Sequence, residues 1–426
     1  MRRVLAVAGG ILFSLGLTLV GAEVALRAIG YEAPVWYRPD PVLGWGLRPG
    51  AKGWFDKEGR GYIQVSPAGF RDRTHDLAKP KGTYRIAVLG DSYAEAMQVD
   101  FKSTFWWQLQ EKLSACVPPE VQVEVMNFGV SGYGTAQESE LLERTAIRYQ
   151  PDLVLLAFTN GNDLLNNSAA LEPEKDRPFY RVGANGLSLD DSFARTDVFR
   201  KRSSPWLERF RAASDRLRLA QLVHEAKKRV EAIRAGAAHA ADSAAPGASP
   251  SVPGAEPGTA LAAFAPPRDA AWRDAWTVTE ALISRMNAFS SSHGARFALV
   301  AISHGIQVTP DAELRRSAEN ALGVHDLFYI ERRMEALGRR EGFPVIALAP
   351  EMQRRATEDR VFLHGFRNVG LGIGHWNEEG HRMAAELIAK RLCNGIVPSA
   401  PRATQAAARA AVVQTATQKS YPPTLR

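Results

Sequence analysis

Five short apolar runs, each bounded by turn residues, place the strongest constraint on the fold of this chain. They are rich in aliphatic and β-branched residues and do not alternate with polar ones, which is typical of strands buried on both faces. Helical patterns separate most of them, so we predict a doubly wound parallel sheet with helices on both faces. The runs are 85–89, 121–127, 152–158, 297–302 and 344–348, and the helical patterns are 104–115, 136–149, 270–291, 312–340 and, last, about 377–393.

The N-terminal segment 1–28 is long and apolar enough to cross a membrane. Nineteen residues from Val4 to Ala22 carry no charge, and the arginines Arg2 and Arg3 before them favour a cytoplasmic N-terminus. The segment could stay attached as an anchor, but the small residues at its end also fit a signal-peptide cleavage site. Either outcome exports the remainder, so we expect inner-membrane anchoring that faces the periplasm, or secretion.

The charge and the cysteine content exclude several classes of partner. The formal net charge is +7, but Arg2, Arg3 and the tail 397–426 account for most of the excess, so no basic face for nucleic acid is predicted. The two cysteines form no Cys/His cluster with the spacing of zinc ligands. We therefore expect no nucleic-acid partner, no metal and no cofactor.

Three further segments surround the predicted sheet. Residues 29–83 have Pro and Gly between short alternating runs, which predicts an irregular lead-in with a hairpin. The main domain, 84–396, contains an insertion, 164–267, that is too long for an ordinary loop. This insertion is either a lid over the site or a solvated surface excursion. Its Ala/Pro/Gly/Ser-rich part 235–267 is expected to be disordered, as is the tail 397–426.

Four short strings bring chemically active residues to one edge of the predicted sheet. The first three follow predicted strands directly, and the carboxyl ends of parallel strands meet at the edge where ligands bind. The strings are G-D-S at 90–92, N-F-G-V-S-G at 127–132, G-N-D at 161–163 and H-W-N-E-E-G-H at 375–381.

These strings supply the groups that acyl-ester chemistry needs. Ser92 is the candidate nucleophile. Its backbone N–H, the N–H of Gly132 and the side-chain amide of Asn162 are candidate donors to an oxyanion. Each residue also has an ordinary alternative, namely a turn serine, a turn glycine and an Asx turn or helix cap. The joint occurrence of all four strings favours the catalytic interpretation.

Two histidines of the last string are candidates for the general base. His375 precedes Asn377, a suitable N-cap for the last helix, and can reach across the sheet edge toward Ser92. His381 is expected to pack within that helix, so His375 is favoured. His304, after the fourth strand, is expected to have a structural role.

The strings and their order resemble those of the SGNH, or GDSL-type, hydrolase family, over about 84–165 and 295–393. The resemblance implies a three-layer, flavodoxin-like α/β fold with five parallel strands in the order 2-1-3-4-5. The strings G-W-G-L-R-P-G and G-F-R-D of the lead-in look like those of membrane-anchored members. The matches are Ser92 to the block I serine, Gly132 to the block II glycine, Asn162 to the block III asparagine and His375 to the block V histidine.

Two positions depart from the family pattern. The family usually has Asp three residues before the histidine, where this chain has Gly372, and Gly where this chain has Asn160. The group that orients the imidazole of His375 is therefore missing from its usual position. A backbone carbonyl or a distant carboxylate could replace it, or a Ser–His dyad could act alone.

The implied topology also brings the two cysteines together. In a flavodoxin-like sheet the first and last helices lie side by side with their C-terminal ends adjacent, and Cys116 and Cys393 lie at those ends. We expect a disulfide, with two buried thiols as the alternative.

The resemblance and the candidate residues together predict an exported serine esterase. Its substrates would be O-acyl esters, including O-acetyl esters, of envelope glycans or lipids, with an acyl-enzyme on Ser92. One alternative is an O-acyltransferase that uses the same site. Another is a degenerate, non-catalytic factor for carbohydrate binding or assembly, which Gly372 favours.

Overall fold

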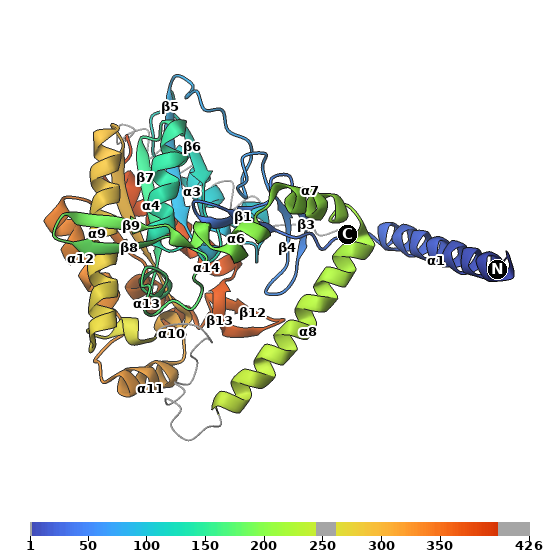
Figure 1. The fold of residues 1–426 in the computed structure, drawn as a ribbon. Helices are drawn as coiled ribbons and strands as arrows, with labels where there is room; N and C mark the ends of the chain where they lie inside the picture. Colours follow the sequence, from blue (N-terminus) through green and yellow to red (C-terminus); the bar gives the residue numbers. More distant parts are fainter. Residues whose placement is uncertain (1, 244–260, 399–426) are drawn as a thin grey trace, which may run out of the picture.

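A five-stranded parallel sheet forms the centre of the molecule (Figure 1). The structure is a computed structural model and describes residues 2–243 and 261–398. The strands follow the spatial order β6-β5-β7-β10-β11, which is 2-1-3-4-5 when they are numbered along the chain. The predicted fold class and strand order are therefore confirmed. The strands are β5 (Thr83–Gly90), β6 (Gln122–Asn127), β7 (Leu153–Thr159), β10 (Arg296–Ile302) and β11 (Val345–Ala347).

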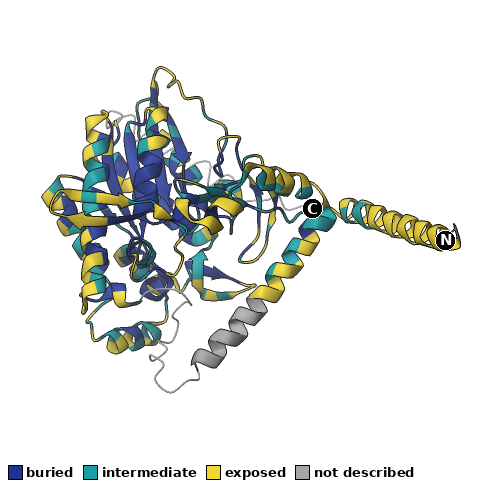
Figure 2. Ribbon diagram, in the orientation of Figure 1, coloured by how far each residue is buried: buried dark blue, intermediate teal, exposed yellow. Residues whose placement is uncertain are grey.

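Helices cover both faces of this sheet, because alternate residues of each strand point to opposite sides. In β5, Ile86 and Val88 pack on one face, whereas Ala87 and Leu89 pack on the other. Figure 2 shows the sheet as the buried layer between helices with exposed outer surfaces. The first face carries α3 (Phe105–Ser114), α13 (Ala349–Asp359) and α14 (Glu378–Cys393), and the second carries α4 (Thr135–Arg144), α9 (Ala270–Ser292) and α12 (Tyr329–Glu341).

The helical patterns of the sequence correspond to more elements than expected. The pattern 312–340 is two helices, α11 (Ala312–Leu322) and α12, because Gly323 ends α11 in the left-handed conformation with a φ of 67°. The pattern 136–149 is α4 followed by the 3₁₀ helix η2 (Ala146–Tyr149). Two antiparallel hairpins were not predicted, β8–β9 (Phe179–Gly183 and Gly186–Asp190) and β12–β13 (His364–Phe366 and Gly370–Trp376).

The lead-in forms two small hairpins that pack against the segment after β5. Ile63 of the lead-in shares a buried apolar cluster with Met97, which follows the short helix α2 (Ser92–Glu95). The buried guanidinium of Arg71 donates hydrogen bonds to the carbonyl oxygens of Glu95, at 3.0 Å, and Val99, at 2.6 Å. The lead-in is thus packed on the sheet domain through a small apolar cluster of its own and through Arg71. Its hairpins are β1–β2 (Tyr37–Asp40 and Gly44–Leu47) and β3–β4 (Lys52–Phe55 and Gly61–Gln64), and η1 (Phe101–Ser103) follows Val99.

The insertion 164–267 is more ordered than the sequence indicated. The expected disorder of 235–267 is wrong at both ends, since helix α8 continues to Ser243 and the chain returns through a 3₁₀ helix in which Ala263 and Phe264 are buried in the main core. Residues 244–260, like the tail from 399, lie outside the described residues. Besides β8–β9, the elements of this region are α5 (Asn162–Asn166), η3 (Ser192–Arg195), α6 (Asp197–Arg202), α7 (Pro205–Ser214), α8 (Arg218–Ser243) and η4 (Leu261–Phe264).

Helix α1 (Arg2–Ala28) projects away from the body (Figures 1 and 2). Among the described residues it is the one helix long and apolar enough to cross a membrane, which fits a signal anchor or a signal peptide. Its C-terminal end contacts the start of α8, where the Glu23 carboxylate accepts the backbone N–H groups of Arg218, at 3.1 Å, and Leu219, at 2.9 Å. These N–H groups have no partner within the helix, so the carboxylate caps α8.

Cys116 and Cys393 are joined by a disulfide in the structure, with their Cα atoms 5.9 Å apart. Cys116 follows α3 and Cys393 is the last residue of α14, and both cysteines pack against the same core cluster. The bond closes a loop between residues 277 positions apart.

Replacing both cysteines by serine is expected to lower the free energy of unfolding by about 3–5 kcal/mol, because the crosslink restricts the unfolded chain over a long loop. Urea denaturation of the oxidised wild type and of the Cys116→Ser/Cys393→Ser variant measures the difference. Peptide mapping under non-reducing conditions that recovers both thiols free would contradict the bond.

Candidate active site

Ser92 begins the short helix α2 directly after the carboxyl end of β5. Asp91 caps this helix, and its carboxylate accepts the backbone N–H of Tyr93 at 3.0 Å. The helix is a single turn because Ala96 ends it in the left-handed conformation, with a φ of 54°. Ser92 remains 8% exposed, so this turn holds its hydroxyl at the sheet edge that the sequence predicted.

His375 lies within hydrogen-bond distance of Ser92. Its Nε2 is 2.7 Å from the Ser92 Oγ. The histidine belongs to strand β13, and Asn377 caps α14 as predicted, since its side chain accepts the N–H groups of Glu379 and Gly380. The Tyr93 ring packs against the imidazole, with ring centroids 5.0 Å apart. The hairpin therefore places the imidazole over the start of α2.

Glu58 supplies the carboxylate that the usual family position lacks. Its Oε2 is 2.5 Å from His375 Nδ1, and its Oε1 accepts the backbone N–H of His375 at 2.6 Å. Burial raises the pKa of the Glu58 carboxyl, but its hydrogen bonds with His375 outweigh this effect, and the pKa lies below its ordinary value. A charged Glu58 holds the Nδ1 proton, so that Nε2 carries no proton and can accept that of Ser92.

The turn between β3 and β4 carries Glu58 to this position. Asn368, in the β12–β13 turn, accepts the N–H of Gly59 at 3.1 Å and donates to the carbonyl oxygen of Asp56 at 3.1 Å. Gly374 has a φ of +83°, and a Cβ at this position would lie 2.1 Å from Glu58 Oε1. A glycine next to His375 is therefore required for the carboxylate to approach.

Sequence reasoning missed Glu58 because it lies 317 residues from His375. The sequence did show that Gly372 leaves the usual acid position without a carboxylate, and a distant carboxylate was one of the expected substitutes. An acidic residue in the turn of a predicted hairpin was the available signal. Nothing in the local pattern linked that turn to the histidine.

Gly132 and Asn162 lie on the loops that the sequence indicated. Gly132 follows β6 with a φ of 77°, and its carbonyl oxygen accepts a hydrogen bond from Arg177 at 3.0 Å. Asn162 begins α5 after β7, and its side chain is hydrogen-bonded to Asp91, the residue before Ser92. Both residues are thus at the same sheet edge as Ser92. We propose that the Gly132 N–H and the Asn162 amide donate to an oxyanion at this edge.

Three buried carboxyl groups lie beneath this edge. Asp91 accepts the hydroxyl of Thr159 at 2.9 Å, and Asp163 accepts the backbone N–H of Thr159 at 2.8 Å. Burial raises the pKa of Asp91, and it raises those of Glu138 and Asp163 well above their ordinary values, an effect that neighbouring carboxylates increase for these two. Raised pKa values reduce the negative charge near Ser92, which lowers the electrostatic cost of forming an oxyanion there.

The other histidines near the site are buried structural groups. The Nδ1 of His381 accepts the backbone N–H of Phe105 at 3.2 Å, and burial lowers its pKa to about 3. His304 caps the short helix α10 (Gly305–Val308), and burial lowers its pKa to about 4. His364 donates from Nδ1 to the Gly374 carbonyl at 2.8 Å, which supports strand β13.

Asn160, the second departure from the family pattern, belongs to a buried polar network. Its amide donates to Glu331 Oε1 at 2.6 Å, and the amide of Gln307 donates to the same oxygen at 2.7 Å. Burial raises the pKa of Glu331 to about 7. The network connects the end of β7 with α10 and α12, so Asn160 has a structural role.

The raised pKa of Glu331 predicts a pH-dependent stability. The folded state favours the protonated carboxyl, so this stabilisation is fully present below the ordinary pKa and is lost as pH rises through about 7. Glu331→Gln is expected to remove this contribution to the pH dependence, to which other buried carboxyls add. At pH 8 the variant should be more stable than the wild type by as much as about 3 kcal/mol.

Chemical denaturation between pH 4.5 and pH 8 measures this difference. Glu335→Gln, on the same helix but 43% exposed, serves as the control and should follow the wild type. A Glu331→Gln curve parallel to that of the wild type at all pH values would contradict the raised pKa.

No protein-family profile and no curated protein matches this chain. Several solved structures are similar to it. One, a catalytic mutant of an acetylxylan esterase from Geobacillus stearothermophilus, is 11% identical with a TM-score of 0.35, over 75% of this chain and 97% of that one. Another, a GDSL-like lipase from Bacteroides thetaiotaomicron, is 10% identical with a TM-score of 0.32, over 76% and 93%.

A third similar structure is an α/β-hydrolase enzyme from the metagenome of Lake Arreo. It is 12% identical with a TM-score of 0.35, over 73% of this chain and 97% of that one. Likenesses at this level carry no functional argument, so the function of this chain is inferred from its own site.

Proposed function

We propose that this chain is a serine esterase of the SGNH type. The proposal rests on one observation, the hydrogen-bonded series from Ser92 Oγ through the His375 imidazole to the Glu58 carboxylate, with distances of 2.7 and 2.5 Å. A serine hydroxyl is a weak nucleophile unless a positioned base removes its proton. This series provides the base and the group that orients it, which supports catalysis over a purely binding role.

Ester hydrolysis would proceed in two steps. The Ser92 Oγ attacks the ester carbonyl while His375 Nε2 takes the hydroxyl proton, and the Glu58 carboxylate stabilises the imidazolium that forms. The oxyanion accepts hydrogen bonds from the N–H groups of Ser92 and Gly132 and from the amide of Asn162. The leaving alcohol takes the proton from His375. A water molecule, deprotonated by the same imidazole, then attacks the acyl carbon, and Ser92 Oγ leaves with the proton that His375 returns, which releases the carboxylic acid.

The substrates that we propose are O-acyl esters, including O-acetyl esters, of glycans or lipids in the cell envelope. The apolar helix α1 supports an exported body that stays close to a membrane. The same acyl-enzyme could pass its acyl group to a sugar hydroxyl in place of water. Analysis of the products formed with glycan acceptors distinguishes transfer from hydrolysis.

A fluorescent phosphonate probe is expected to label the wild-type protein on Ser92, because the activated hydroxyl attacks phosphorus as it would an ester carbonyl. Ser92→Ala should abolish both labelling and the hydrolysis of 4-nitrophenyl acetate. Mass spectrometry of the labelled peptide identifies the site. A folded wild-type protein that neither reacts with the probe nor hydrolyses the ester would refute the proposal.

Glu58→Gln is expected to lower kcat by about 10²–10⁴-fold with little change in KM, because the amide cannot stabilise the imidazolium and can favour the wrong tautomer. The matched control is Asp56→Asn in the same turn, which should retain wild-type kcat. Steady-state kinetics with 4-nitrophenyl acetate measures both. If Glu58→Gln turns over at the wild-type rate, Glu58 has no part in the reaction.

A further inference from the structure

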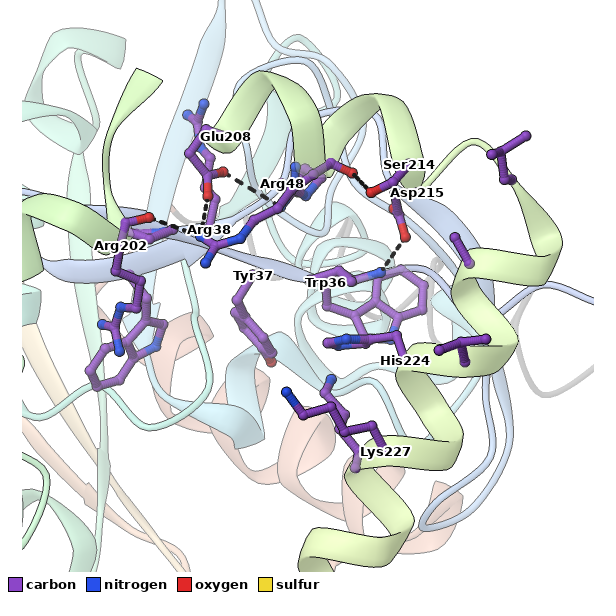
Figure 3. A pocket seen from close by; sticks show the side chains of 18 of the residues that line it. Trp36, Tyr37, Arg38, Arg48, Arg202, Glu208, Ser214, Asp215, His224 and Lys227 are labelled. Carbon is purple, nitrogen blue, oxygen red and sulfur yellow. Dashed lines mark hydrogen bonds and ion pairs between the residues drawn. The ribbon is translucent and has the colours of Figure 1, made fainter. Parts of the chain in front are cut away.

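A pocket of about 1040 Å³ lies between the lead-in and the insertion (Figure 3). Trp36 and Tyr37 of the lead-in line it on one side, and His224 and Lys227 of α8 line it on the other. Ser131, the residue before Gly132, also lines it. The pocket therefore adjoins one of the loops of the candidate active site.

Two residues of the pocket wall contact this loop directly. Trp45 donates from its indole N–H to the carbonyl oxygen of Ser131 at 3.0 Å. Arg177 donates to the carbonyl oxygen of Gly132 at 3.0 Å, and its guanidinium lies 5.0 Å from the centre of the Trp45 ring. A molecule held against Trp45 and Arg177 would therefore lie next to the proposed oxyanion donor.

Cationic side chains outnumber carboxylates in the lining of the pocket. Seven arginine and lysine side chains line it, against the three carboxylates of Glu174, Glu208 and Asp215. Glu208 is 3.5 Å from Arg48 and 2.7 Å from Arg211. Carboxylates just outside the lining lie near most of the other cations, such as Asp176 at 2.8 Å from Arg202 and Glu225 at 4.0 Å from Lys228. Attraction of an anion therefore depends on the guanidinium and ammonium groups at the pocket wall more than on an unbalanced net charge.

Several arginine N–H groups of the lining are buried without a hydrogen-bond partner among the described residues. They are Nε and Nη1 of Arg177, Nε of Arg48 and Nε of Arg202. The Arg177 side chain is 4% exposed, and the Glu172 carboxylate lies 3.6 Å from it. Burial lowers the pKa of Arg177, although neighbouring carboxylates oppose this. A buried donor without an acceptor costs about 1–3 kcal/mol. An anion in the pocket would contact the accessible atoms of the same arginines and favour their charged form.

An apolar part of the lining lies close to helix α1, which is long and apolar enough to cross a membrane. Leu217, Leu219 and Val223 line the pocket at the start of α8. This end of α8 is the one that Glu23 of α1 caps. A ligand with an anionic group and an apolar chain fits both parts of this lining, and the neighbouring helix α1 favours one that comes from a lipid phase.

We propose that this pocket binds the anionic group of an amphiphilic molecule, a phosphate on an alkyl chain, and holds it beside Gly132. That this molecule is the ester substrate rests on the function proposed above, whereas the binding itself does not.

The test measures binding of dodecyl phosphate, below its critical micelle concentration, to the full-length Ser92→Ala protein by the fluorescence of its tryptophans. Dodecyl phosphate should bind saturably, and dodecyl maltoside, inorganic phosphate and a uronate oligosaccharide should each bind at least tenfold more weakly. Arg48→Gln and Lys227→Gln should each weaken the binding of dodecyl phosphate at least tenfold. Arg209→Gln, an exposed residue of α7 outside the lining, should leave it unchanged.

Lys227 keeps the test decisive if Arg48→Gln disturbs the fold, because its side chain is 73% exposed. Equal binding of the neutral detergent, tighter binding of the uronate or of inorganic phosphate, or a Lys227→Gln variant that binds like the parent would overturn the proposal. Since binding is measured without turnover, a failure here leaves the labelling of Ser92 as an independent result.

Discussion

The contact between Glu58 and His375 is the interaction on which the candidate site depends. A histidine at the end of a short hairpin has no fixed tautomer or ring orientation unless a partner holds its Nδ1. Glu58 holds both the ring and the backbone N–H of His375. The turn that presents Glu58 is in turn held by Asn368, and the approach requires the absent side chain of Gly374. The geometry of the serine hydroxyl and the imidazole is thus set by a segment outside the sheet.

This dependence changes the status of the lead-in. The sequence presents residues 29–83 as an irregular segment before the catalytic domain, whereas in the structure they share a core with the segment after Ser92. They also form one wall of the cationic pocket and lie close to the start of α8. We therefore propose that residues 29–398 fold as one unit, with 244–260 outside the described residues. Glu58 belongs to this lead-in, and the pocket and helix α1 adjoin it.

The carboxyl groups around the site differ in the direction of their pKa shifts, and Glu58 is the one paired with the histidine. Burial raises the pKa values of the carboxyls beneath the sheet edge, Asp91, Glu138 and Asp163. Hydrogen bonds with His375 lower that of Glu58 instead. Groups of the same chemical type thus have opposite shifts because one is paired with a possible cation and the others are buried near each other. Glu58 contacts the Nδ1 of the imidazole, whereas Ser92 contacts its Nε2.

The sequence by itself determined the parallel sheet, its helical layers and the position of the serine and of the favoured histidine at one sheet edge. These features follow from local periodicity and from short strings next to strand ends. Each such signal lies within one continuous segment of the chain. The tertiary structure alone decided which carboxylate replaces the one absent at Gly372, that Asn160 joins a buried network with Glu331, and that the insertion closes a pocket against the lead-in. Each of these is a contact between segments far apart in the chain, and such contacts depend on how the packed elements meet, which no local pattern of residues encodes.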